Sequence, residues 1–351
     1  MISHLRTQHI EMNLTAHLVK SKSTVGNDTL QSPFRELIDN DCYFVVFIHY
    51  FWENLFMDLP LVSIVCNCYN HAPYVLEAIQ SVQQQTYKNI ELIVLDNGST
   101  DNSLGIIQDY LKDFPEVKFI HLNEPLPLPK AFNTMFKYTN GDFLIDLSAD
   151  DVLLTDCVQK QVDFFQKQDD STGIVFGNAY LIDENGQNPT PFFDVDNEGK
   201  VLDSRLHSFD YYLMLHSGKT FCSVSAMMRR THFIALNSYD ESLFFEDLDY
   251  WYRLSRRFRI RFIDDFLVKK RQLNHSLGAQ IDAKGKHTHL LNLSLIKIYR
   301  SAISYNSPKE NKALLQRIHY SMSVCFQHHL WADLLRFTYL KFLCQVHCLF
   351  R

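Results

Sequence analysis

The sequence contains no hydrophobic run long enough to cross a membrane. A spanning helix needs about 20 consecutive apolar residues, and the nearest candidate, Cys42 to Phe56, is short and is interrupted by polar side chains. It also lacks the basic flank and the small-residue cleavage site of a signal peptide. The rest of this N-terminal part is polar and aperiodic. We therefore expect residues 1–57 to form an extension that is disordered or not part of the native protein.

Basic residues are not in excess. The chain has 34 lysines and arginines against 40 acidic residues, a net charge of −6 and a pI near 6.2. A protein that neutralises a phosphate backbone needs a basic surface. We therefore expect no nucleic-acid partner, although a local pocket for a single nucleotide remains compatible with this composition.

The 8 cysteines and 16 histidines do not follow the spacing of a zinc or redox site. Cys66 and Cys68 stand two apart in one apolar run, where reduced thiols act as small hydrophobes. This pattern predicts a reducing, cytoplasmic compartment. No Ser-His-Asp or Cys-His arrangement for a covalent nucleophile stands out either.

From Leu61 onward the sequence alternates short apolar runs with amphipathic segments. This alternation predicts an α/β fold with a mostly parallel central sheet flanked by helices. After Asp151 the pattern loosens, and the C-terminal part looks helical. We expect one domain over residues 58–275 and a helical region over residues 276–351. The expected strands are 61–66, 91–96, 117–122, 143–147, 173–183 and 260–268, and the expected helices are 72–85, 104–112, 130–138 and 246–257.

Polar residues follow three of the expected strands. They are Tyr69-Asn70, Asp96-Asn97 and Ser148 to Asp151. In open α/β sheets, ligands bind beyond the carboxyl ends of the strands. We expect these three segments to converge on one crevice.

Two adjacent carboxylates, Asp150 and Asp151, follow the apolar strand FLIDL. Two charges at a buried strand end are unfavourable unless a cation or hydrogen-bond donors compensate them. Mg²⁺ and Mn²⁺ take oxygen ligands and commonly join one or two carboxylates to substrate phosphates. The alternative is a solvated turn that caps the next helix, and the pair alone does not decide between the two.

Two long motifs give the pair a context. The first, over residues 61–157, contains LVSIVCNCYNHAPYVLEAIQSVQQQTYKNIELIVLDNGSTDNS and then GDFLIDLSADD; the second, over residues 244–265, reads FFEDLDYWYRLSRRFRIRFIDD. In order and spacing they resemble family 2 glycosyltransferases of the Rossmann-like GT-A fold. The resemblance implies a nucleotide-sugar-dependent, inverting enzyme that uses Mn²⁺ or Mg²⁺.

The resemblance also implies roles for individual residues around the donor. Asp96 would accept a hydrogen bond from the nucleobase, usually uracil, and the backbone near Cys68 and Tyr69 would line the nucleotide pocket. Asp150 would be the direct metal ligand, with Asp151 orienting the donor sugar or the metal's waters. The alternative for Asp96 is a turn or helix-capping aspartate, and both roles are compatible.

The sequence departs from the family at the first position of the metal motif. The family has an aspartate there, and this chain has Ser148. One carboxylate fewer is available to the ribose and the metal. This departure motivates an alternative function, that of a catalytically weak nucleotide-sugar-binding or partner protein.

Glu246 and Asp247 match the family's Glu-Asp motif, whose aspartate is the catalytic base of inverting members. A carboxylate suffices, because the acceptor proton becomes acidic only as the new bond forms. The alternative is that the two acids stabilise the start of a helix. The resemblance favours catalysis.

The segment VKKRQLNHS resembles the family's basic segment after the last strand. It would bring Arg271 to the diphosphate and His275 towards the metal, although Lys270 replaces a tyrosine and the histidine's register differs. Lys130 and Asn133 lie near the position at which the family has an asparagine close to the donor. An equal alternative is that these two residues pack their helix against the core.

The resemblance also bears on partners and location. Family members often build surface polysaccharides on a glycan or lipid-linked acceptor, which implies loose attachment of a cytoplasmic protein to the inner membrane face. The aromatic, weakly basic C-terminal stretch suits a packed helix somewhat better than a membrane-surface one. A nucleotidyltransferase is disfavoured, because no glycine-rich, lysine-bearing phosphate loop follows the first strand.

Overall fold

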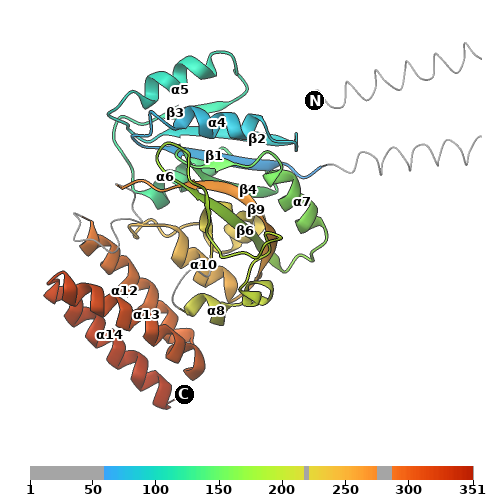
Figure 1. Ribbon diagram of the computed structural model, residues 1–351. Coiled ribbons are helices and arrows are strands. Elements are labelled where there is room, and N and C mark those ends of the chain that lie inside the picture. The colour runs from blue at the N-terminus through green and yellow to red at the C-terminus, as the bar shows by residue number, and fades with distance from the viewer. Residues whose placement is uncertain (1–58, 217–220, 275–286, 351) are drawn as a thin grey trace, which may run out of the picture. The chain divides into compact units, whose positions relative to one another are not determined.

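The computed structural model describes residues 59–216, 221–274 and 287–350. The expected N-terminal extension and His275 lie outside the described residues. Within them, the predicted α/β fold with a central sheet and a helical C-terminal region is confirmed (Figure 1).

Four parallel strands form the first half of the sheet. They are β1 (Val62–Cys68), β2 (Ile90–Asp96), β3 (Lys118–His121) and β4 (Phe143–Ser148), in the order β3-β2-β1-β4. β1 lies in the middle and is buried along nearly its whole length. Its apolar run VSIVC has neighbours on both faces, as is typical of a parallel sheet covered by helices on both sides.

The second half of the sheet is mixed. It contains β5 (Val152–Leu153), β6 (Thr172–Ile182), β7 (Thr190–Pro191), β8 (Met227–Arg229) and β9 (Arg259–Arg271). The short strand β8 is antiparallel to both β4 and β6, and β6 is parallel to β9. β6 and β7 form a hairpin around the turn ENGQ.

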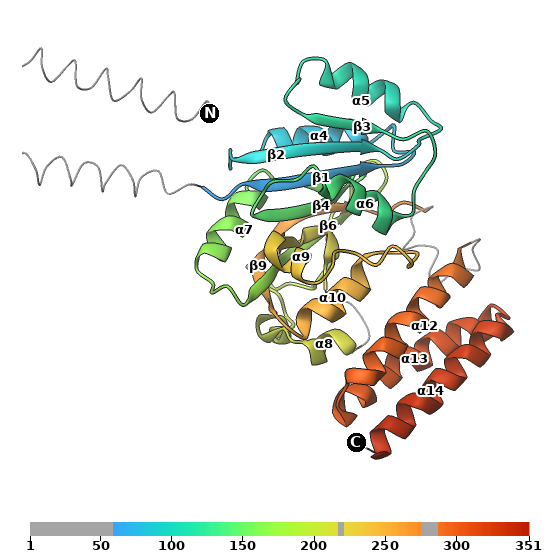
Figure 2. The ribbon, with the colours of Figure 1, turned by 180° about the vertical axis from the view of Figure 1, so that it is seen from behind.

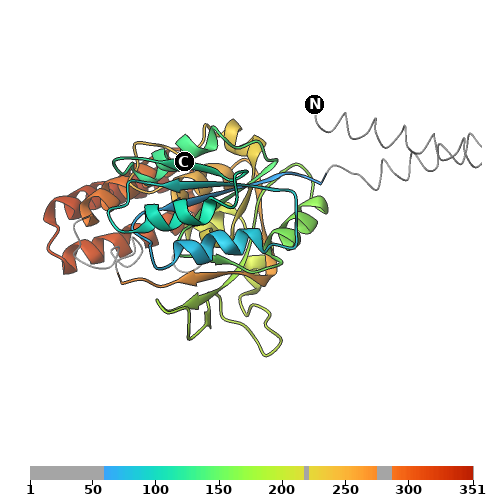
Figure 3. The same cartoon turned by 90° about the horizontal axis from the view of Figure 1, so that it is seen from above.

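Helices cover both faces of the first half. They are α4 (Val75–Gln83), α5 (Ser103–Leu111) and α6 (Leu128–Phe136). α4 and α5 lie next to each other along one face (Figure 3), and α6 lies on the other (Figure 2). Right-handed crossovers produce this arrangement, because the chain moves outward from β1 to β3 and then returns to β4.

Several predicted boundaries differ from the observed ones. The helix expected from Ala72 begins at Val75, because residues 71–74 form a turn in which the Ala72 N–H donates to the Asp101 carboxylate rather than within a helix. Helix α7 (Cys157–Gln166) was not among the helices expected from the sequence. Its buried residues Val158, Val162 and Phe165 follow a helical spacing, but it has only three turns and a polar outer face.

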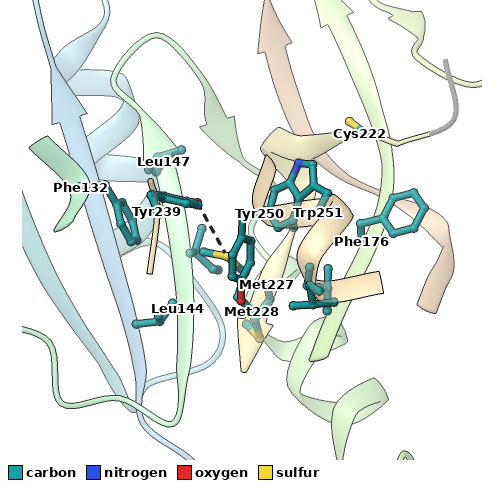
Figure 4. Close-up of a cluster of buried hydrophobic side chains, with 14 of the residues drawn as sticks. Phe132, Leu144, Leu147, Phe176, Cys222, Met227, Met228, Tyr239, Tyr250 and Trp251 are labelled. Carbon is teal, nitrogen blue, oxygen red and sulfur yellow. Dashed lines mark hydrogen bonds between the residues drawn. The ribbon is translucent and has the colours of Figure 1, made fainter. Parts of the chain in front are cut away.

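The core beneath the second half of the sheet is aromatic. Figure 4 shows Phe132 of α6, Tyr239 and Tyr250 packed beside the methionines of β8. The ring centroids of Phe132 and Tyr239 are 4.9 Å apart, and those of Tyr239 and Tyr250 are 5.5 Å apart. The first pair is tilted and the second is edge-on. Aromatic pairs of this kind add roughly 0.5–1.5 kcal/mol beyond the burial of the rings. They fix the position of Tyr239, which reaches the site described below.

Five short helices complete this part of the chain. They are η1 (Ser204–Ser208), α8 (Tyr211–Leu215), η2 (Ser223–Ser225), α9 (Arg230–Ala235) and α10 (Asp247–Ser255). α10 is the helix expected over residues 246–257. Its residues Tyr250, Trp251 and Leu254 are buried.

Three longer helices form the C-terminal region. They are α12 (Thr288–Tyr305), α13 (Pro308–Gln327) and α14 (Trp331–Phe350). Ser307 and Glu310 form a capping box at the start of α13. Arg317 of α13 donates hydrogen bonds to the carbonyl oxygens of Met214 and Leu215, which holds the helices against α8. In the described part of the chain, none of the helices has the length and apolar character that a bilayer crossing requires.

Candidate active site

The carboxyl ends of β1, β2 and β4 lie side by side. Because β1 pairs in parallel with both neighbours, Cys68 is level with Asp96, and Asn67 is level with Ser148. The three polar segments that follow these strands therefore begin at one edge of the sheet, as the sequence predicts.

Side-chain hydrogen bonds join two turns at this edge. Asn70 has a left-handed backbone with a φ of 57°, and its side-chain oxygen accepts from the N–H groups of Thr100 at 2.7 Å and Asp101 at 3.3 Å. Asp101 accepts from the N–H of Ala72 at 3.0 Å and from that of Ser103 at 2.9 Å. The edge of the crevice is thus fixed without a ligand.

A pocket of about 160 Å³ opens between the ends of β1 and β4 and the start of α10. A cavity of that order is large enough for a six-membered ring. Four residues predicted for the site line it, namely Tyr69, Ser148, Glu246 and Asp247. Six other polar or aromatic residues of its wall were not expected from the sequence: Asn67, His71, Asp146, Ser223, Tyr239 and Trp251.

Four buried polar atoms of the pocket wall have no hydrogen-bond partner among the described residues. They are Asn67 Oδ1, His71 Nδ1, Glu246 Oε2 and Trp251 Nε1. A buried polar group without a partner costs roughly 1–3 kcal/mol, so native proteins rarely leave one unexplained. Their convergence on one pocket indicates a polar ligand with both hydrogen-bond donors and acceptors.

Trp251 contributes a ring and a donor to this wall. Its side chain is 95% buried, since only 5% of the residue is exposed. In Figure 4 its indole nitrogen lies at the end of the ring that points away from Met227, whereas the Tyr250 hydroxyl points towards Met228. An aromatic face beside a free N–H suits a ligand that is apolar on one side and carries hydroxyl groups.

Glu246 and Asp247 stand at the start of α10. Asp247 is the first residue of the helix, and its carboxylate accepts from the N–H of Leu248 at 2.6 Å. Burial raises the pKa of Asp247. Burial, and then the charge of Asp247, raise the pKa of Glu246 well above its usual value. Perturbed carboxyl groups at the mouth of a pocket are typical of catalytic acids and bases.

Asp146 faces these two acids from β4. Its carboxylate lies 3.5 Å from the Tyr239 hydroxyl. Burial, and then the charge of Asp247, raise the pKa of Asp146 to about 7. The sequence contains a signal that could have identified Asp146. It is an aspartate inside the apolar strand FLIDL, and a buried carboxylate requires a partner or a function.

Asp146 and Ser148 share one face of β4, since side chains alternate along a strand. Both line the pocket. The carboxylate that the family motif would place at Ser148 is missing, and a carboxylate stands two residues earlier, about 7 Å deeper along the strand. The acidic group is therefore shifted along β4 to Asp146, whose pKa is raised by burial and then by the charge of Asp247.

Asp150 and Asp151 point in different directions. The Asp150 carboxylate accepts a hydrogen bond from the Ser148 hydroxyl, and its Oδ1 lies 3.9 Å from His71 Nδ1 at the pocket wall. Asp151 is 4% exposed and accepts from the backbone N–H of Arg271 at 2.8 Å. Burial, and then the charge of Asp150, raise the pKa of Asp151 to about 8.

Arg271 does not reach the pocket in this structure. It is 4% exposed, and its guanidinium donates to the Asp150 carbonyl at 3.0 Å and to Glu77 Oε2 at 2.6 Å. It also donates to the carbonyls of Asp183 and Glu184. Arg271 thus joins the end of β4 to α4 and to the turn of the β6–β7 hairpin.

Asp96 is fully buried at the end of β2. One carboxylate oxygen lies 2.8 Å from His121 Nδ1, and the other accepts from the N–H of Ser99 at 3.3 Å. The second bond is the turn role expected as an alternative. Next to it, Cys68 is buried, and burial raises the pKa of its thiol to about 11.

Lys130 and Asn133 lie on α6 outside the pocket lining. Lys130 is exposed. The Asn133 side chain exchanges hydrogen bonds with the backbone of Tyr239, at 2.9 Å to its carbonyl and 3.2 Å from its N–H. Asn133 thus holds Tyr239 in place from behind, which corresponds to the packing alternative.

These features define a class of protein. A sheet of order β3-β2-β1-β4 has a polar pocket at its strand ends, and it has an acidic pair at the end of β4. The fold is that of GT-A glycosyltransferases. S. aureus TarS, solved with UDP-GlcNAc, superposes with a TM-score of 0.51 over 80% of this chain and 90% of that chain, at 16% identity. The mannosyltransferase PcManGT from Pyrobaculum calidifontis, solved with GDP-Man and Mn²⁺, gives 0.52 over 84% and 88%, at 14% identity.

The chain belongs to glycosyltransferase family 2, whose model, described as Glycosyl transferase family 2, matches residues 63–236. An uncharacterized glycosyltransferase of Rickettsia conorii is 32% identical over 212 residues, which are 60% of this chain. The match covers 34% of the length of that relative. The predicted family and fold are confirmed.

Proposed function

We propose that the chain transfers a sugar from a nucleotide-diphosphate donor, most simply a UDP-sugar, to a hydroxyl of a glycan or lipid-linked acceptor. It would be a hexosyltransferase or a related enzyme of polysaccharide biosynthesis. The observation that carries the proposal is the convergence of four unpartnered polar atoms and the Asp247 carboxylate on one pocket at the strand ends. TarS and PcManGT, two proteins of the same fold, were solved in complex with the nucleotide-sugars UDP-GlcNAc and GDP-Man.

In the proposed mechanism, Asp247 is the base of a single displacement. Its carboxylate takes the proton of the acceptor hydroxyl while that oxygen forms a bond to the anomeric carbon. The bond from the anomeric carbon to the phosphate oxygen breaks, and the nucleoside diphosphate leaves with the electron pair. Attack from the side opposite the leaving group inverts the anomeric configuration. Glu246 would bind acceptor hydroxyls beside the base.

The residues at the end of β4 suit a divalent cation that is shared with the substrate. Asp150 offers a carboxylate, and the unpartnered His71 Nδ1 lies 3.9 Å from it. Within the described residues no three His, Cys, Asp or Glu side chains are grouped as a metal site. Mg²⁺ and similar ions commonly take one or two protein ligands and complete their shell with phosphate oxygens and water. When bound, Mn²⁺ or Mg²⁺ neutralises charge on the leaving diphosphate.

The donor would lie along the ends of β1 and β2. Asp96 would bind the nucleobase and the backbone at Cys68 and Tyr69 would line the nucleotide. Asp151 and Arg271 would act by fixing Asp150, since both are bound to protein groups around it. We also propose a cytoplasmic location and association with the inner face of a membrane, where a lipid-linked acceptor is presented.

Turnover of isotope-labelled UDP-sugars with Mn²⁺ tests the enzyme function. We expect transfer to an acceptor, or slow hydrolysis when water replaces it, and we expect both to be lost in Asp247→Asn. A thermal-shift screen of nucleotides with Mn²⁺ identifies the base, because a ligand that binds only the folded state raises the melting temperature.

Ser148 favours a second candidate, a nucleotide-sugar-binding protein with weak or no turnover. It predicts a thermal shift with a nucleotide-sugar but neither hydrolysis nor transfer across common donors. In that case Asp247→Asn would leave the cell's glycans unchanged.

A further inference from the structure

The outer face of α14 carries a stripe of exposed apolar side chains, called here the α14 stripe. Its members are Trp331 (53% exposed), Leu335 (71%), Tyr339 (56%), Phe342 (59%) and Leu349 (79%). Their spacing places all of them on one face of a helix with 3.6 residues per turn. The opposite face is buried, with Phe337, Leu340 and Cys344 at 2% exposure or less.

The α14 stripe lies on the outermost of the three C-terminal helices. α12 contacts α10, and α14 packs against α13 and α12. Figures 1 and 2 both show α14 as the member of the three that is farthest from the sheet. At the end of α13, Phe326 is 62% exposed and its ring lies 5.8 Å from that of Trp331. This aromatic pair extends the stripe around the turn.

An apolar stripe of this length is unusual on a protein surface that has no binding partner. Single exposed apolar residues are common and need no explanation. A continuous stripe along a helix of 20 residues, about 30 Å long, marks an interaction site.

The charge of this region identifies the kind of partner. Residues 287–350 contain seven lysines and arginines and two acidic residues, although the whole chain has a net charge of −6. Both acids are engaged: Glu310 closes the capping box of α13, and Asp333 is 2% exposed between His289 and Arg336. The C-terminal region therefore has an excess of basic residues, although Lys297 pairs with Asp240 and Arg336 with Asp333.

Two of the basic residues flank the α14 stripe. At about 100° per residue, Arg336 and Lys341 lie on opposite sides of its centre line. Long basic side chains can lay their methylene stems along an apolar surface and extend the charge to its rim. Aromatic and leucine side chains between two basic edges are the features of a helix that lies in a membrane interface.

We propose that the α14 stripe inserts into the surface of an anionic lipid bilayer, with Arg336 and Lys341 at the level of the head groups. This assigns the membrane association proposed above to one face of one helix. A second copy of the chain is the competing occupant. The basic flanks disfavour it, because a two-fold contact along α14 would bring like charges together.

Vesicle flotation of the full chain tests the proposal without requiring turnover. We use vesicles of phosphatidylcholine alone and vesicles of equal parts phosphatidylcholine and phosphatidylglycerol. We expect binding to the anionic vesicles that weakens with added salt. The double variant Leu335→Gln/Phe342→Gln should lower the partition coefficient at least about tenfold, because two apolar side chains lose their burial. Lys341→Gln should lower it about threefold to fivefold, on anionic vesicles only.

The matched control is Leu202→Gln/Ile234→Gln, which changes two exposed apolar residues, 65% and 49% exposed, outside the C-terminal helices. It should bind like the unchanged chain. Melting temperatures and the nucleotide thermal shift verify that each variant folds. Equal binding to both kinds of vesicle, or unchanged binding of the Leu335/Phe342 variant, would overturn the proposal. A third result would also overturn it: the unchanged chain does not bind vesicles but forms a dimer in solution, and the Leu335/Phe342 variant is a monomer.

Discussion

Two groups of carboxylates meet at the end of β4, and they differ in how far their polar atoms are satisfied. Asp151 and Glu77 bind Arg271, whose guanidinium is buried and directed at protein acceptors. Across the pocket, Glu246 has an oxygen without a partner, and Asp146 has only a long contact with Tyr239. Each carboxylate of the first group has a protein donor, whereas the second group contains a buried oxygen that has none among the described residues.

This difference separates a structural role from a chemical one. A satisfied buried network stabilises one arrangement of the chain. Unsatisfied carboxylates destabilise the folded protein, and a ligand that supplies donors to them regains that free energy. Arg271 should therefore matter mainly for stability, and Asp247 mainly for turnover.

The largest expected effect is on turnover in Asp247→Asn. We expect sugar transfer to fall about a thousandfold, because general bases commonly contribute roughly 10²–10⁴ to rate. Nucleotide binding should change little, and the melting temperature should not fall, because the neutral amide avoids the burial of a charge. Asp249→Asn is the matched control on the same helix, since Asp249 pairs with Arg253 at 2.6 Å outside the pocket. Equal losses in the two variants would refute the role of Asp247 as the base.

The second effect is on stability in Arg271→Met. Removing one partner of a buried charged network typically costs about 3–5 kcal/mol. We expect a loss of about 3 kcal/mol in the free energy of unfolding, measured by urea denaturation. Glu77 and the carbonyl oxygens of Asp150 and Glu184 lose their guanidinium donor, whereas Asp151 keeps the backbone N–H of residue 271. If stability is unchanged and nucleotide affinity collapses instead, Arg271 binds the diphosphate directly.

The third effect concerns the pH dependence of stability. Burial and the charge of Asp247 raise the pKa of Asp146 from its usual range near 4 to about 7. Between these values the unfolded chain releases the proton and the folded chain retains it, so stability falls as pH rises from about 4 to about 7.

The variant Asp146→Asn removes this contribution. Its free energy of unfolding should therefore fall less steeply over the same interval, and it should exceed that of the unchanged chain by roughly 1–3 kcal/mol at pH 8. Denaturation at a series of pH values measures both curves. Parallel curves for the two proteins would show that Asp146 titrates normally.

The sequence predicts the first half of the sheet well and the second half less well. β1, β2 and β4 are local apolar runs with polar ends, and their parallel order follows from the helices between them. β8 has three residues and is defined by its pairing with β4 and β6, which are distant along the chain. Such a strand has little signal of its own.

The candidate site divides in the same way. The motifs that hold Asp150 and Asp247 are contiguous in sequence, so resemblance locates them. Tyr239 reaches the pocket from about 90 residues beyond β4 and lies outside both motifs, so only the tertiary structure places it there. Trp251 lies in the second motif, one helical turn after Asp247, so its position follows from that of Asp247. For Arg271 the resemblance and the structure differ. The resemblance places this residue at the diphosphate, whereas in the structure its guanidinium donates to protein acceptors.

The smallest expected effect comes from restoring the missing carboxylate with Ser148→Asp. The added oxygen would lie on the same face of β4 as Asp146 and beside Asp150, where a shared cation has few protein ligands. We expect Mn²⁺-dependent UDP binding, measured by calorimetry, to tighten several-fold, while affinity for UDP without metal falls because a negative charge is added near the diphosphate. Ser148→Asn is the control, since it has similar volume without the charge. If both variants behave alike, the site does not depend on carboxylate count, and the shift of the acidic group from Ser148 to Asp146 has no bearing on the metal.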